Sequence, residues 1–139
     1  MSTPRRRARV LAFQALFEHE SAGHSAAEAL EQLLAHGAPR EETVVFAKEL
    51  VEGTIRHWSE IDGELHSLAP AWPLEQMSGV DKNILRLALY ELLFDNRAPF
   101  KAAINEAVEL AKTFGSDNSA RFVNGVLGTV AARRAQPVA

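Results

Sequence analysis

Cysteine is absent from this chain of 139 residues, so disulfide bonds and thiolate chemistry are excluded. No apolar run approaches the roughly 18 residues that a membrane-spanning helix requires. The basic start of the chain is followed by an amphipathic pattern, not by the apolar core and cleavage site of a signal peptide. We therefore expect a cytoplasmic protein that does not use a membrane.

Motifs of known chemistry are also missing. The sequence has no glycine-rich phosphate loop, no dinucleotide-binding fingerprint and no nucleophile elbow. Its five histidines lack the spacings of di-iron or zinc-protease helices. Glu106 and Glu109 stand at i, i+3 and could pair as carboxylates, but a solvated helix face is the favoured interpretation. We expect no catalytic residue, no metal and no cofactor, and so no enzyme.

Positive charge is concentrated at one end of the chain. Four of the 15 basic residues lie within the first nine positions: Arg5, Arg6, Arg7 and Arg9. The other 11 basic residues are outnumbered by 18 acidic residues. The net charge of −3 argues against bulk binding of nucleic acid. Thr3–Pro4 predicts a helix start, where each cation costs roughly 0.3–1 kcal/mol. The cluster therefore indicates an anionic partner, with nucleic acid favoured and an acidic lipid surface as the alternative.

Apolar residues recur at helical spacing along nearly the whole chain, without strand alternation or a repeat. The length fits one domain over residues 1–139, of the all-α class. One long helix is expected from Glu41 to Leu65, with Pro70 and Pro73 ending it and separating subdomains of about 1–70 and 74–134. The expected helices begin at Pro4, after Ser25, near Glu41, at Leu74, at Val80, near Phe100 and after Ser116 or Asp117.

The first helix carries two apolar stripes. The first stripe consists of Ala8, Leu11, Ala12, Ala15 and Leu16, and the second of Val10, Phe13 and Phe17. A small protein seldom needs two stripes on a terminal helix. Either the helix is deeply buried, which we favour, or its second stripe contacts a partner.

Three segments of the C-terminal half closely resemble the NusB family of bacterial transcription antitermination factors. They are Val80–Leu92 (VDKNILRLALYEL), Ala103–Gly115 (AINEAVELAKTFG) and Phe122–Leu127 (FVNGVL). The arginine run followed by Gln14–Phe17 is similar to that family too. The resemblance implies about seven helices in two small bundles packed together. It also implies a non-enzyme that binds boxA of nascent ribosomal RNA as a single strand, together with the ribosomal small-subunit protein NusE. The pair would join RNA polymerase and suppress premature termination of ribosomal RNA operons.

A related RNA-binding domain, such as the one joined to ribosomal RNA cytosine methyltransferases, is the alternative. The chain carries no cofactor-binding domain, which disfavours this alternative.

The resemblance also implies the residues that bind RNA. They are Arg5, Arg6, Arg7, Arg9, Lys101, Asn118, Ser119, Arg121 and Phe122. Guanidinium groups bind phosphate bidentately, and a helix N-terminus offers free N–H groups to it. Phe122 lies beside the apolar stripe of the last helix, so it either stacks on a base or packs at the edge of the core. Many family members carry an acid where this chain has Asn118, which puts that contact in question.

Partner-binding residues follow from the same resemblance: Phe13, Phe17 and Asp81. Phe17 stands where the family often has tyrosine, so it keeps the apolar contact and loses the hydroxyl. Asp81 would attract a basic ribosomal protein, or it is a carboxylate favoured by the helix dipole. The stripe with Phe13 and Phe17 would serve either NusE or a second copy in a homodimer.

Overall fold

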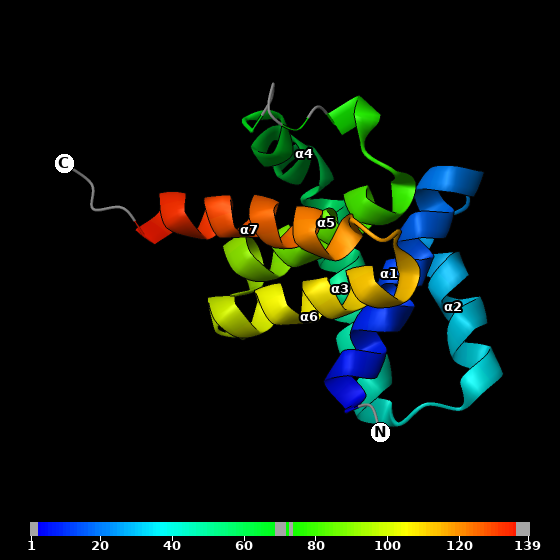
Figure 1. The fold of residues 1–139 in the computed structure, drawn as a ribbon. Coiled ribbons are helices and arrows are strands. Elements are labelled where there is room, and N and C mark those ends of the chain that lie inside the picture. The colour runs from blue at the N-terminus through cyan, green and yellow to red at the C-terminus, as the bar shows by residue number, and fades with distance from the viewer. Residues whose placement is uncertain (1–2, 69–71, 73, 136–139) are drawn as a thin grey trace.

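The computed structural model describes residues 3–68, 72 and 74–135, and every regular element among them is helical (Figure 1). The all-α prediction is confirmed. The elements are α1 (Pro4–Ala22), α2 (Ala26–Gly37), α3 (Glu41–Arg56), α4 (Trp58–His66), the 3₁₀ turn η1 (Leu74–Gln76), α5 (Gly79–Tyr90), the π-helical turn η2 (Glu91–Asp95), α6 (Phe100–Phe114) and α7 (Ser119–Ala135). Within these ranges no helix has the length and apolarity to cross a membrane.

Short polar side chains start three of the helices. The sequence predicts Thr3 and Ser25 in this role, whereas α5 begins at Gly79, one residue before the expected Val80. The hydroxyl of Thr3 accepts a hydrogen bond from the N–H of Arg6 in the first turn of α1. Ser25 and Ser78 do the same for α2 and α5. Each cap satisfies an N–H group that has no partner inside its helix.

The expected long helix from Glu41 to Leu65 is wrong in one respect, because the chain bends at His57 between α3 and α4. Spacing alone places Val44, Ala47, Val51, Thr54 and Ile55 on one inward stripe, and the structure buries Ala47, Val51 and Thr54. Ile55 is 37% exposed, whereas Phe46 and Leu50 are buried. Many aliphatic residues on α3 fit more than one stripe, and the contacts with neighbouring helices determine which stripe is buried. Pro70 and Pro73 lie outside the described residues, so the break expected there stays a prediction.

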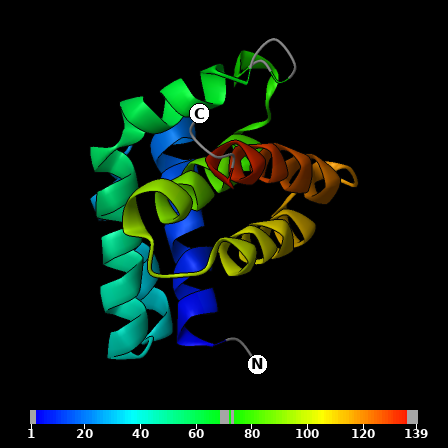
Figure 2. The same ribbon diagram turned by 90° about the vertical axis from the view of Figure 1, so that its left-hand side faces the viewer.

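Two small bundles pack together around one buried cluster of aliphatic residues. The first bundle consists of α1, α2 and α3, and the second of α5, α6 and α7. Figure 2 shows α6 and α7 as an antiparallel pair beside α5. Helix α5 contacts α1 and α3 as well as α6 and α7, so it joins the bundles. This matches its sequence, which is apolar nearly all round.

The polar residues of α5 are buried as well. Arg86 is 3% exposed and forms ion pairs with Asp62 and Glu20, at 2.8 and 2.7 Å. Asn83 donates a hydrogen bond to Glu20, and the Arg86 guanidinium lies 4.0 Å from the ring centroid of Trp58. These contacts satisfy the buried charge and tie α5 to α1 and α4.

Gly53 sets the distance between α3 and α5. A Cβ atom at this position would overlap the Tyr90 ring. We expect Gly53→Ala to lower the free energy of unfolding by about 1 kcal/mol, since overpacking costs about 1–3 kcal/mol and helix propensity returns about 1. Urea unfolding measures the change. Gly63→Ala is the control, because a Cβ there meets nothing within 4 Å and should not destabilise the protein.

Candidate nucleic-acid interface

Arg5 and Arg7 are the free cations at the start of α1. Both side chains are exposed, and neither forms an ion pair with a residue in the described ranges. The Arg5 guanidinium lies 4.7 Å from the ring centroid of Phe46, so the ring supports it without neutralising it. These two side chains are available to an anion.

Arg6 is already paired, with a carboxylate from α6. Its Nε and Nη2 atoms donate hydrogen bonds of 3.1 and 2.8 Å to Glu106. These hydrogen bonds lower the pKa of Glu106 below its ordinary value, although partial burial opposes them. The expectation that Glu106 belongs to a solvated face was therefore wrong: its side chain is 19% exposed and pairs with Arg6, whose side chain is 47% exposed.

Arg9 is buried, unlike Arg5, Arg6 and Arg7. It is 6% exposed and donates hydrogen bonds of 2.9 and 2.8 Å to Glu91. Burial alone would lower the pKa of Arg9, but the hydrogen bonds and charge of Glu91 raise it overall. Glu91 begins the π-helical turn η2, and its side chain is 3% exposed. The geometry makes Arg9 part of the core and leaves its guanidinium no room for phosphate.

The predicted RNA-binding residues at the loop between α6 and α7 differ in exposure. Asn118 and Arg121 are exposed. Ser119 is 2% exposed, and its hydroxyl accepts a hydrogen bond from the N–H of Ser116. Ser119 therefore shapes the turn, while Asn118 and Arg121 face solvent.

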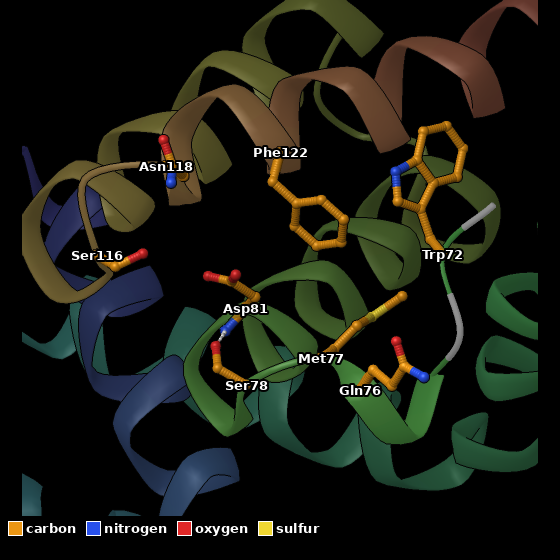
Figure 3. A pocket seen from close by; sticks show the side chains of 8 residues that line it. All are labelled: Trp72, Gln76, Met77, Ser78, Asp81, Ser116, Asn118 and Phe122. Atoms are coloured by element: carbon orange, nitrogen blue, oxygen red, sulfur yellow. Dashed lines mark hydrogen bonds between the residues drawn. The ribbon is translucent and has the colours of Figure 1, made fainter.

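Phe122 forms one wall of a cleft of about 340 Å³, which we name the Phe122 cleft (Figure 3). The Trp72 ring lies at a centroid distance of 6.5 Å from the Phe122 ring, edge to face. Met77 and Asp81 line the same cleft, as does Asn118 at its rim. Phe122 is half-buried: it packs at the edge of the core and presents a ring surface to the cleft, while stacking on a base stays a prediction.

Phe17 lines a second cleft of about 370 Å³, the Phe17 cleft, together with Phe13, Val80 and Phe114. Phe13 is 3% exposed, and its ring lies 5.0 Å from that of Phe114, so it is mainly a core residue. Phe17 is 36% exposed and supplies the accessible apolar surface.

The two clefts adjoin at the start of α5. Val80 lines the Phe17 cleft, and the next residue, Asp81, lines the Phe122 cleft. Asp81, which was predicted to bind the protein partner, therefore lines the same cleft as Phe122, which was predicted to bind RNA.

Lys101 is exposed in the first turn of α6, five residues before Glu106. Five helical residues span about 7.5 Å, so Lys101 lies about that far along α6 from Glu106, the partner of Arg6. Residues 115–119 follow the other end of α6, a helix of 15 residues. The N-terminal arginines therefore lie against the middle of α6, with Lys101 toward its start and Asn118 beyond its end.

Sequence reasoning missed Trp72 and Met77 as cleft residues and Glu91 as the partner of Arg9. The only available signal for Trp72 was an aromatic residue between two prolines. Among the described residues no cluster of three or more His, Asp or Glu side chains could hold a metal ion.

Comparisons with known proteins agree on one family. Residues 6–132 match the NusB family. The transcription antitermination protein NusB of Dehalococcoides mccartyi (strain CBDB1) is 48% identical over 130 residues, covering 94% of this chain and 91% of the relative. The protein of the same name from Chloroflexus aggregans is 50% identical over 135 residues, covering 96% and 90%. These names favour an antitermination factor over a methyltransferase-linked domain.

Solved structures share the fold. NusB of T. maritima matches with a TM-score of 0.86 and 39% identity, covering 95% of this chain and 93% of that one. A chain from a crystal structure of the antitermination factors NusB and NusE in complex with dsRNA matches with a TM-score of 0.87 and 26% identity, covering 96% and 99%. The family match over residues 6–132, the identities of these relatives and the shared fold together establish that this chain belongs to the NusB family.

Proposed function

We propose that this protein is a cytoplasmic transcription antitermination factor that binds boxA-type RNA of nascent ribosomal RNA transcripts as a single strand. It acts with NusE and joins the RNA polymerase antitermination complex. The observation that carries the proposal is the family match over residues 6–132, in a chain whose relatives are named transcription antitermination proteins.

The exposed groups support an RNA surface with two kinds of contact. Arg5, Arg7 and Lys101 offer cations for phosphates at one end. Phe122 offers a half-exposed ring on which a base can stack, beside the amide of Asn118. Cations supply affinity without sequence preference, so selectivity for boxA has to come from contacts such as those of the Phe122 cleft.

The Phe17 cleft supports the partner side of the proposal. Its apolar lining suits a protein surface, and it adjoins the Phe122 cleft at Val80 and Asp81. NusE bound there would lie next to the RNA, so each ligand would strengthen binding of the other. A homodimer through Phe17 is the competing use of this cleft, and light scattering of the protein alone and with NusE distinguishes the two.

Titration of labelled RNA tests the function directly. A boxA-type RNA and a scrambled RNA of the same composition are each titrated with the protein, in the absence and presence of NusE. We expect preference for the boxA-type RNA, increased by NusE. Equal binding of both RNAs under both conditions would remove the antitermination proposal.

Phe122→Ala should weaken binding of boxA-type RNA roughly 5- to 150-fold, because stacking of one base contributes about 1–3 kcal/mol. The measurement is the dissociation constant at fixed salt. Phe94→Ala is the control: this ring is also half-buried but stacks on His57, with ring centroids 4.0 Å apart, away from the Phe122 cleft. If both variants lose affinity equally, the loss reflects folding and Phe122 is no stacking platform.

A further inference from the structure

Helices α1 and α3 begin at the same end of the molecule (Figures 1 and 2). Residues at both helix starts line a third cleft. We name it the Arg40 cleft. Its volume is about 410 Å³, and its lining includes Thr3, Arg7, Gly37, Pro39, Arg40 and Thr43. Arg40 and Thr43 were not among the residues that the sequence suggested for RNA binding. Two helix starts and two arginines therefore line this cleft, and of the two arginines only Arg7 was predicted to bind RNA.

The charges of this cleft are unneutralised. Arg7 and Arg40 are both exposed, and neither forms an ion pair within residues 3–68, 72 and 74–135. A Cβ at Gly37 would lie 2.9 Å from Nη2 of Arg7, so the absence of a side chain there leaves room for the guanidinium against the α2–α3 connection. Two unpaired guanidinium groups lining one concave surface favour a bound anion.

The start of α3 adds hydrogen-bond donors. Its N-cap residue, Arg40, makes no side-chain hydrogen bond to the first turn, so backbone N–H groups of that turn are left without a capping partner. Thr43, in the same turn, is 2% exposed and lines the cleft. Its hydroxyl makes no hydrogen bond to any residue that the structure describes. A hydroxyl without a protein partner can donate a hydrogen bond to an anion in the cleft.

We propose that the Arg40 cleft binds a phosphate group of the RNA backbone, held by Arg7, Arg40, the Thr43 hydroxyl and the start of α3. The inference rests on the proposed RNA-binding function and extends its surface from α1 onto the α2–α3 connection. Glu41 and Glu42, the acids of the same turn, line a neighbouring groove with Arg5 and are not part of the lining of this cleft. The phosphate therefore meets donors and cations inside the cleft.

The test compares two arginines of one helix. Arg40→Gln removes the proposed contact, and Arg56→Gln removes an exposed, unpaired arginine from the other end of α3, about 24 Å away. Binding of labelled boxA-type RNA is measured at several salt concentrations. For Arg40→Gln we expect about tenfold weaker binding and a decrease of about 0.7 in the slope of log K against log salt, with no change for Arg56→Gln. Thr43→Val, which removes only the hydroxyl function, should weaken binding in the same direction.

Methylphosphonate substitution identifies the phosphate itself. Neutralising one phosphate at a time should reveal a position that weakens binding to the unmodified protein but not to Arg40→Gln. Thermal unfolding with inorganic phosphate as the probe distinguishes a site for RNA from one for free anion: stabilisation by inorganic phosphate combined with unchanged RNA binding by Arg40→Gln would overturn the proposal. If the unmodified protein binds RNA and Arg40→Gln binds it equally, this inference fails while the proposed function stands. If the unmodified protein binds no RNA, both fail.

Discussion

Replacing Arg9 with alanine is expected to lower the free energy of unfolding by about 3–5 kcal/mol, the largest effect of any single arginine in the N-terminal cluster. The substitution leaves the Glu91 carboxylate, 3% exposed, without its cation. A buried unpaired charge costs far more than the lost ion pair contributes. Urea unfolding measures the change as a lower midpoint at an unchanged slope.

Two further variants separate this explanation from a simple loss of packing. Arg5→Ala removes an exposed guanidinium from the same helix and should change stability by less than about 0.5 kcal/mol. Arg9→Met combined with Glu91→Leu removes both charges and should recover most of the stability lost in Arg9→Ala. If the double variant is no more stable than Arg9→Ala, the buried charge is not the cause.

Removing Arg5 and Arg7 together is expected to reduce the salt dependence of RNA binding by about 1.4 in the slope of log K against log salt, from about 0.7 per phosphate contact. Both side chains are exposed and unpaired within the described residues. Adding Arg6→Gln to this double variant should lower the slope by less than the value for one full phosphate contact, because an RNA phosphate must displace Glu106 from Arg6. Titrations at several salt concentrations give the slopes.

Arg56→Gln with Arg133→Gln is the matched control for that experiment, since it removes the same charge from exposed positions elsewhere on the surface. Its slope should equal that of the unmodified protein. An equal decrease in both double variants would mean that the arginines act through net charge and not through local phosphate contacts.

Much of the fold follows from short-range patterns. The caps at Thr3 and Ser25 and the helical spacing of aliphatic residues depend on neighbours three or four positions away, so the sequence was sufficient to predict them. The bend at His57 was not predictable in this way. It depends on how α3 and α4 each pack against α5, and local spacing does not contain that information.

The sequence by itself determined that this protein is all-helical, belongs to the NusB family and carries an isolated basic end on an acidic chain. Only the tertiary structure decided what each arginine of that end does. Arg9 meets Glu91 across 82 positions of sequence and Arg6 meets Glu106 across 100, whereas Arg5 and Arg7 stay free. Because an ion pair depends on distance in space and on burial, four arginines close together in sequence divide into one that is paired in the core, one that is paired at the surface and two without an ion pair in the described residues.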